Sequence, residues 1–310
     1  MPANLPPQYF AAEKRYREAK TPEDKIKALE EMLAIMPKHK GTDKLQAALR
    51  AKIAKFRRII EEQKRTGKGR YAFYIEKEGA GQVILVGAPN SGKSLLMRRL
   101  TNTDTKVAPY PFTTTGPVVG MMEFEDIKIQ LVDLPPLTES PMPGLFGIIH
   151  DSDALLWIHD VTDPNPIRIE TEKQQLLARK PQDKILAVIN KIDLVNPPSL
   201  DRWRSLLRDF KLHFISAQTL QGLEELRRMI FDILAVIRVY TKAPGKPIEY
   251  SDPLILPKGS TLLDAAEEIH KDFAHKLKYA RLWRGTSIKG LRVEKNHILE
   301  DRDVVEFHIK

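Results

Sequence analysis

One stretch of the chain combines glycine, lysine and serine at a spacing that can bind phosphate: Gly87-Ala88-Pro89-Asn90-Ser91-Gly92-Lys93-Ser94. It fits the pattern G-x-x-x-x-G-K-[ST]. The apolar segment 82–86 before it predicts a buried strand, and segment 94–100 after it predicts a helix. A glycine-rich turn between strand and helix aims backbone N–H groups and the positive end of the helix dipole at an anion. The stretch therefore predicts a loop that holds the phosphates of a nucleotide.

In such a loop Lys93 would add a charge on the β- and γ-phosphates, and the Ser94 hydroxyl would ligate Mg²⁺. The alternative interpretation is a glycine-rich turn that carries Lys-Ser by chance, which the strand and helix in register disfavour. We expect the nucleotide contacts of this loop from consecutive residues: Ala88, Pro89, Asn90, Ser91, Gly92, Lys93, Ser94 and Leu95.

A second motif, Asn190-Lys191-Ile192-Asp193, follows a predicted buried strand. In N-K-x-D the carboxylate of the aspartate accepts the N1 and N2 protons of guanine, a paired contact that adenine cannot make. The lysine stem can pack along the base. The next predicted strand is followed by Ser216-Ala217-Gln218, where backbone N–H groups can support the guanine O6. These positions favour GTP over ATP.

Two further segments fit a site for Mg²⁺ and the γ-phosphate. Asp133 comes directly after the apolar segment 127–132, where a carboxylate supports the metal. A threonine in the segment 111–115 can close on Mg²⁺ and the γ-phosphate when GTP is bound. We expect Thr114 in this role, with Thr113 as the alternative. The other interpretation of these threonines is an ordinary polar loop.

Strand and helix patterns alternate over residues 81–240, which predicts an α/β domain with a mainly parallel sheet. We expect strands near 83–87, 118–124, 127–132, 154–159, 185–190 and 213–215, and helices near 93–103, 167–179, 200–209 and 223–240. After Pro244-Gly245-Lys246-Pro247, which predicts a linker, the chain predicts a small α+β module. Its expected helix is 261–270, and its strands lie around 254–256, 279–283 and 304–309.

The segment before the sheet is basic and helical. Residues 8–66 predict helices, one beginning at Thr21-Pro22 and a longer one near Thr42-Asp43. The whole net charge of +9 lies within residues 1–70, because the remaining basic and acidic residues cancel. The cations are either a solvated helix face or a surface for nucleic-acid phosphates, and a membrane surface is a third, weaker alternative. The candidates for RNA contact are Lys52, Lys55, Arg57 and Arg58.

Composition narrows the class of protein. The 310 residues suffice for two or three domains. The absence of cysteine excludes disulfides, thiolate zinc sites and cysteine nucleophiles. No apolar run reaches the length of a membrane span, and the first residues lack the pattern of a signal peptide. We expect a cytoplasmic protein without membrane contact.

At this point the motifs resemble a known family. The phosphate loop with Pro89-Asn90, the segment 110–114 and the N-K-x-D motif resemble the Obg/Drg branch of translation-factor-type GTPases. The C-terminal module, with Ser251-Asp252-Pro253 and the segments 258–261 and 299–305, resembles a TGS domain of the Drg type. The resemblance covers residues 80–310 well and 40–70 weakly.

The resemblance implies a fold, an activity and partners. It implies a basic helical segment at 1–78, a P-loop GTPase domain at 79–242 and a TGS domain with a β-grasp, ubiquitin-like fold at 243–310. It further implies a monomer that binds GTP and GDP and hydrolyses GTP as a switch. The partner would be the ribosome or structured RNA, with the TGS domain and the basic helices as contact surfaces.

The chain departs from the family pattern D-x-x-G after Asp133, because the fourth position is Pro136. In the family the glycine N–H donates to the γ-phosphate, whereas proline has no N–H and a fixed φ. We expect GTP binding to persist, with weaker sensing of the γ-phosphate and low turnover. The alternative function is a GTP/GDP-binding adaptor with little or no hydrolysis.

Catalysis must then rest on other groups. Leu137 follows Pro136, where a glutamine could have oriented water. In relatives that use potassium, an asparagine at the place of Asn90 ligates a monovalent cation that offsets developing charge. The resemblance thus implies Lys93, Thr114 and Asn90 as the catalytic set, with Mg²⁺ and K⁺. Only residues 138–149 separate this region from the next strand, so we expect the helical insertion of Drg proteins to be absent. The regulatory partner that reads this insertion in relatives is therefore not assumed, and a regulatory protein that binds elsewhere stays an open alternative.

Overall fold

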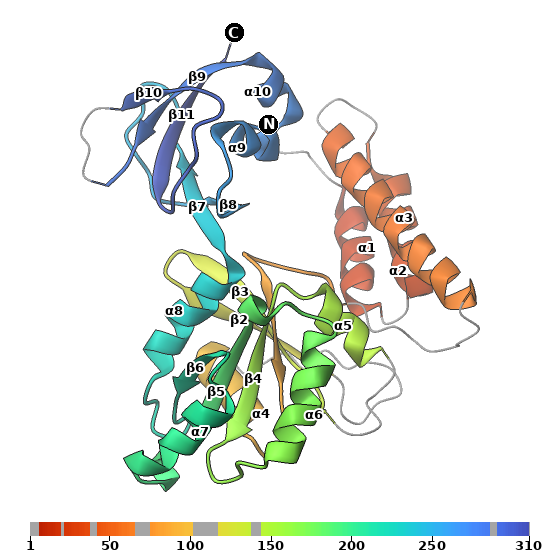
Figure 1. The fold of residues 1–310 in the computed structure, drawn as a ribbon. Helices are drawn as coiled ribbons and strands as arrows, with labels where there is room; N and C mark the ends of the chain where they lie inside the picture. The colour runs from red at the N-terminus through yellow and green to blue at the C-terminus, as the bar shows by residue number, and fades with distance from the viewer. Residues whose placement is uncertain are drawn as a thin grey trace. The chain divides into compact units, whose positions relative to one another are not determined.

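The computed structural model describes residues 6–19, 22–37, 42–65, 75–101, 117–137, 144–285 and 290–309. The chain divides into two compact units. The first holds the N-terminal helices, and the second holds two β-sheets with their helices (Figure 1). Each unit has its own buried core.

The first unit contains three helices, α1 (Pro7–Glu18), α2 (Pro22–Ile35) and α3 (Asp43–Arg65). Pro22 occupies the first position of α2, and acidic residues follow in its first turn, as the sequence predicts. Apolar side chains at helical spacing bury one stripe of each helix against its neighbour. The buried set is Tyr9, Ala12, Ala28, Leu29, Met32, Met36, Leu49, Ile53 and Phe56.

The first sheet of the second unit has the order β2-β3-β1-β4-β5-β6. Only β2 is antiparallel to its neighbour, so the predicted mainly parallel sheet is confirmed. A parallel sheet covered on both faces needs near-continuous apolar strands, and Val83 to Val86 of β1 are fully buried. The strands are β1 (Gln82–Val86), β2 (Val118–Phe124), β3 (Ile127–Asp133), β4 (Ala154–Asp160), β5 (Ile185–Asn190) and β6 (Lys211–Phe214).

Helices connect these strands: α4 (Lys93–Thr101), α5 (Leu145–Asp151), α6 (Pro166–Leu177), α7 (Leu200–Leu206) and α8 (Leu223–Leu234). The short helix α5 was not expected. The core of this domain includes Leu85 of β1, Leu96 of α4 and Ile230 of α8. Its two tryptophans, Trp157 and Trp203, are fully buried.

The predicted helix 223–240 is wrong in its second half. Ala235 has φ 55° and a left-handed conformation, which ends α8 at Leu234. Strand β7 (Val236–Thr241) starts at the next residue, where β-branched and aromatic side chains favour a strand over a helix. Since β7 belongs to the second sheet, that sheet begins before the expected domain boundary at 243.

The second sheet has the order β10-β9-β11-β7-β8. Strands β7 and β11 are parallel, and the other pairs are antiparallel. Helix α9 begins with a capping box, in which Thr261 and Asp264 each satisfy the other's backbone N–H. Its remaining elements are β8 (Leu254–Pro257), α9 (Leu262–Ile269), α10 (Lys271–Lys276), β9 (Leu277–Trp283), β10 (Leu291–Val293) and β11 (Asp303–Ile309).

A buried arginine joins the two sheets. The guanidinium of Arg238 on β7, 3% exposed, donates to Asp301 at 2.7 Å and 3.0 Å. It also donates to Glu125 at 2.5 Å and Asp126 at 2.7 Å, both in the turn between β2 and β3. The Tyr240 hydroxyl donates to Asp126 as well. We call these five residues the Arg238 cluster.

Charge pairing dominates the titration of the Arg238 cluster. Hydrogen bonds to Asp301 raise the pKa of Arg238 further above its usual range. Burial alone would raise the pKa of Asp126, but hydrogen bonds from Tyr240 and Arg238 outweigh it and lower that pKa. The pKa of Asp301 is lowered in the same way by Arg238.

Candidate functional site

The predicted site residues of the first sheet meet at one edge, where its parallel strands have their carboxyl ends. The phosphate loop follows β1, Asp133 ends β3, and Asn190 ends β5. Ser216 lies just after β6. Ligands of open α/β sheets bind at this edge.

The phosphate loop needs its two glycines for separate reasons. Gly87 has φ 147°, and a Cβ there would lie 2.1 Å from the carbonyl oxygen of Ile158 on β4. Gly92 has φ 91°, and a Cβ there would lie 2.3 Å from Nδ2 of Asn190. Asn90 between them has φ 60°, a conformation that asparagine tolerates better than most residues. The sequence pattern therefore reflects close packing of this loop against β4 and β5.

Lys93 is buried within the loop. Its Nζ donates to the carbonyl oxygens of Gly87 at 3.0 Å and Ala88 at 2.9 Å. An ammonium group has three donors, so one N–H remains for an anion. Burial lowers the pKa of Lys93, although the charges of Asp133 and Glu172 oppose that shift.

Ser94 and Asp133 form a pair at the start of α4. The Ser94 hydroxyl donates to Oδ2 of Asp133 at 2.7 Å. Oδ1 of Asp133 is buried and has no hydrogen-bond partner among the described residues. Burial raises the pKa of this carboxyl, which hydrogen bonding to Ser94 and the charge of Lys93 only partly offset. A buried carboxylate with an open oxygen beside a hydroxyl fits Mg²⁺, which prefers oxygen ligands and keeps several waters.

Asn190 ties three loops together. Its Nδ2 donates to the carbonyl oxygen of Ser91 at 3.0 Å, and its Oδ1 accepts from the backbone N–H of Lys191 at 2.8 Å and of Ala217 at 3.0 Å. The side chain is 2% exposed. The structure thus places this amide between the phosphate loop, the N-K-x-D loop and the segment after β6.

The remaining residues of the predicted base site lie at the same edge. Asp193 is exposed in a short 3-10 helix, Ile192–Leu194. Ser216 is buried, and its hydroxyl accepts from the backbone N–H of Thr219 at 3.0 Å. Ala217 is buried and Gln218 is exposed. An exposed carboxylate beside a rigid loop can receive the edge of a base.

One residue of this edge was missed by the sequence analysis. Asp160, at the end of β4, forms an ion pair of 2.5 Å with Nζ of Lys191. Its other oxygen accepts from the backbone N–H and hydroxyl of Thr162, which orients the carboxylate. The signal available in the sequence was its position directly after an apolar strand, as for Asp133.

The remaining predicted residues come from the segments 111–115 and 133–137. Thr113 and Thr114 lie outside the described residues. Pro136 is half-buried and Leu137 is buried at the end of the segment that follows β3.

The RNA-contact candidates Lys52, Lys55, Arg57 and Arg58 all lie on α3 of the helical unit. Arg57 forms an exposed ion pair of 2.7 Å with Glu30, and Nζ of Lys52 lies 5.6 Å from the ring centroid of Tyr16.

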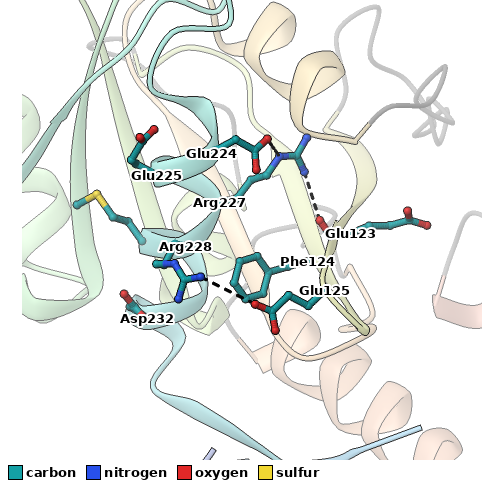
Figure 2. A pocket seen from close by; sticks show the side chains of 9 residues that line it. Glu123, Phe124, Glu125, Glu224, Glu225, Arg227, Arg228 and Asp232 are labelled. Carbon is teal, nitrogen blue, oxygen red and sulfur yellow. Dashed lines mark hydrogen bonds and ion pairs between the residues drawn. The ribbon is translucent and has the colours of Figure 1, made fainter. Parts of the chain in front are cut away.

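A hollow of about 670 Å³ lies at the other edge of the sheet, between the end of β2 and α8 (Figure 2). Its arginines already have partners. Arg227 donates to the carbonyl oxygens of Leu100 and Glu123, and Arg228 lies 3.9 Å from Glu125. None of the residues that line the hollow belongs to the phosphate loop, the N-K-x-D loop or the segment after β6, so the hollow is separate from the nucleotide edge. Its lining is mostly acidic: Glu123, Phe124, Glu125, Glu224, Glu225, Arg227, Arg228, Met229 and Asp232.

Comparisons with known families agree with this geometry. Residues 82–191 match the family model described as 50S ribosome-binding GTPase, and residues 237–309 match that of the TGS domain. The second match begins within β7, as the sheet does. No helix among the described residues has the length and apolar character that crossing a membrane requires.

Curated relatives extend over nearly the whole chain. An uncharacterised GTP-binding protein of Methanocaldococcus jannaschii is 27% identical, covering 93% of this chain and 93% of that protein. The developmentally-regulated GTP-binding protein 2 of Mus musculus is 27% identical, covering 91% of this chain and 98% of that protein. The aligned lengths of 365 and 360 residues exceed the 310 residues of this chain, so both relatives carry segments without a counterpart here.

Among solved structures, a GTP-binding protein from Pyrococcus horikoshii matches with a TM-score of 0.50 and 15% identity, over 74% of this chain and all of that one. That identity supports the fold alone. Together with the two family models and the curated relatives, this match assigns the first sheet of the second unit to a P-loop GTPase fold and the second sheet to a TGS domain. The chain is similar to the Obg/Drg proteins, with a P-loop GTPase fold followed by a C-terminal TGS domain of the β-grasp type.

Proposed function

We propose that this protein binds GTP and GDP, hydrolyses GTP slowly, and acts as a switch on the ribosome or on structured RNA. The observation that carries the nucleotide assignment is the position of Asn190. Its amide joins the loop for the phosphates to the loop for the base, so the two halves of a guanine-nucleotide site are built as one piece.

We assign the roles in binding as follows, and for the described residues the geometry supports them. The free N–H of Lys93 and the N-terminus of α4 would hold the phosphates. Asp193 would accept from the guanine edge, and the backbone at Ala217 would support it. Asp160 would hold Lys191 beside the base. Ser94, Asp133 and Thr114 would hold Mg²⁺, which supplies charge neutralisation for the phosphates.

Two groups that usually support hydrolysis are replaced in this chain. Pro136 has no N–H to give to the γ-phosphate, and Leu137 cannot orient a water by hydrogen bonding. Asn90, held with φ 60° at the rim of the loop, is exposed and would take the role of a ligand for K⁺. The competing function is a nucleotide-gated adaptor without hydrolysis, which Pro136 favours.

Single-turnover hydrolysis of GTP with Mg²⁺, in potassium and in sodium, separates the two functions. We expect slow hydrolysis that potassium accelerates and that Asn90→Ala makes independent of the cation. Equal rates in both salts would remove K⁺ from the proposal. No hydrolysis above the rate of free GTP, with tight binding intact, would leave the adaptor.

The ribosome and RNA part of the proposal is supported by the basic charge of residues 1–70 and by the family description of the matched domain. With such a partner the protein would act in the cytoplasm. Co-sedimentation with ribosomal particles, with a GTP analogue, with GDP and without nucleotide, tests it. We expect salt-sensitive binding that changes with the nucleotide and weakens when Lys52, Lys55, Arg57 and Arg58 become glutamine. Equal binding to anionic vesicles would contradict it.

A further inference from the structure

The TGS sheet packs one of its faces on α9. Alternate residues of a strand point to opposite faces. Ala280, Leu282 and Val305 are buried in the core with α9 residues. Arg281, between Ala280 and Leu282, and Glu306, next to Val305, therefore belong to the opposite face, which we call the outer face. These two residues are direct cross-strand partners.

The outer face has two halves. Its β7 half carries Arg238 and Tyr240, which contact the turn between β2 and β3. Its other half, formed by β9, β10 and β11, has β10 as the edge strand. There Arg281 and Arg292 are exposed, and Tyr279 is half-exposed.

Three side chains from three strands form a stack on this open half. The rings of Tyr279 on β9 and His308 on β11 are 4.6 Å apart and nearly parallel, at 12°. The guanidinium carbon of Arg292, on β10, lies 4.2 Å from the ring centroid of Tyr279. Since β10 and β11 flank β9, Arg292 and His308 lie on opposite sides of Tyr279. The stack therefore ends, at the sheet edge, in an exposed and planar cation.

The charges on this half are not balanced. Arg281 and Arg292 stand directly opposite each other on paired strands, an arrangement of like charges that costs stability. Glu306, the other cross-strand partner of Arg281, instead pairs with Lys242 and with His308 at 2.8 Å. Neither arginine has an ion pair with a carboxylate among the described residues, whereas Arg238 and Lys242 on the same face both do. A bound anion would relieve the repulsion between these two arginines.

We propose that this half of the outer face binds single-stranded RNA. A nucleobase stacks on the free side of the Arg292 guanidinium and extends the stack, while Arg281 binds the adjoining phosphate. An acidic peptide would satisfy the charge but has no flat group to continue the stack. The inference rests on the proposed RNA partner of this protein and names the surface that receives it.

The test is binding of a short labelled oligouridine to the full-length protein, measured by fluorescence anisotropy. Arg292→Ala and Arg281→Ala are each expected to weaken binding roughly tenfold, the effect of losing one stacked base or charged contact. Arg292→Lys keeps the positive charge but removes the planar guanidinium on which a base can stack, so it should bind oligouridine as weakly as Arg292→Ala. Lys258→Ala, an exposed cation at the opposite edge of the same sheet, is the matched control and should bind normally. All three sites are exposed, so none of the four variants is expected to lower the melting temperature.

Repeating the series with Lys52, Lys55, Arg57 and Arg58 changed to glutamine removes RNA affinity of the helical unit. Full affinity of Arg292→Ala for oligouridine would overturn this inference, and ribosome binding that still depends on nucleotide would then leave the proposed function standing. Absence of binding to RNA and to ribosomal particles in every nucleotide state would overturn both. Binding of polyglutamate but not oligouridine, lost in Arg292→Ala and kept in Arg292→Lys, would assign the face to an acidic protein instead.

Discussion

The carboxylates at the two edges of the GTPase sheet have opposite surroundings. At the carboxyl edge, Asp133 has one oxygen without a partner among the described residues, and burial raises its pKa. At the amino edge, Asp126 accepts from Arg238 and Tyr240, and its pKa is lowered. The carboxylate of Asp133 at the carboxyl edge therefore lowers the stability of the free protein, whereas the carboxylate of Asp126 at the amino edge helps to join two domains.

The comparison distinguishes polar groups that are left open for a ligand from polar groups that stabilise the fold. A buried charge without its partner is costly, so it persists where something outside the chain completes it. Lys93 follows the same rule, because it is buried with a free donor and a lowered pKa. The variants below test this distinction. Changes at the carboxyl edge should mainly weaken nucleotide binding, and changes at the amino edge should mainly lower the free energy of unfolding.

The largest effect is expected at Asp193. Asp193→Asn removes the acceptor for the guanine edge and should weaken GTP binding roughly a thousandfold, because a site built for a polar contact rejects its loss strongly. Stability should stay unchanged, since the side chain is exposed. Isothermal calorimetry measures the affinity, with Asp183→Asn, another exposed aspartate of a short 3-10 helix, as the control. A normal affinity would place the base elsewhere.

The second largest effect is expected at the amino edge of the sheet, on stability. Arg238→Met leaves three carboxylates without their shared cation and should cost about 3 kcal/mol of unfolding free energy, less than a fully buried network because the carboxylates are partly exposed. GDP affinity should not change. Urea unfolding measures the loss. Arg302→Met is the matched control, since Arg302 reaches the same Glu125 at 3.7 Å but is 59% exposed and should cost little.

A pair of smaller changes should differ in sign. Asp126→Asn should destabilise the free protein by about 1 kcal/mol, and Asp133→Asn should stabilise it by a similar amount while removing Mg²⁺-dependent nucleotide binding. The contribution of Asp126 is complete above its unfolded pKa of about 3.9 and is lost as pH falls through its lower folded pKa. For Asp133 the folded pKa is raised, so the penalty of its charge is relieved as pH falls through that value. Unfolding free energies of both variants across acidic pH measure this, and equal signs would contradict the distinction.

The smallest effect is expected at Pro136. Pro136→Gly supplies an N–H for the γ-phosphate and should raise the preference for GTP over GDP several-fold, about the value of one hydrogen bond to a charged group after the entropy of the freed chain is counted. Calorimetry with both nucleotides on both proteins measures the ratio. Equal ratios would mean that the γ-phosphate is not sensed through this position.

Local patterns in the sequence marked residues that lie together at the carboxyl edge, and gave no sign of the contacts at the amino edge. Gly87, Lys93, Asp133 and Asn190 are each marked by a motif or by the end of an apolar strand. The Arg238 cluster depends on contacts between residues more than one hundred positions apart, which no local pattern records.

The end of α8 was missed for a different reason. A left-handed residue after a helix is usually glycine, and here it is Ala235. With no glycine or proline as a signal, the apolar run through Tyr240 predicted one continuous helix.

The hairpin of β2 and β3 runs between the two edges, with Asp133 at one end and Asp126 at the other. It pairs without interruption from Val118 with Asp133 to Phe124 with Ile127. A slip of one residue would turn Ile129 and Leu131 out of the core, so the hairpin keeps its register and changes position only as a whole. If a bound nucleotide displaced the hairpin, the displacement would therefore reach the Arg238 cluster and, through it, the TGS domain. By thermodynamic reciprocity, a ligand of that domain would change nucleotide affinity by the same factor.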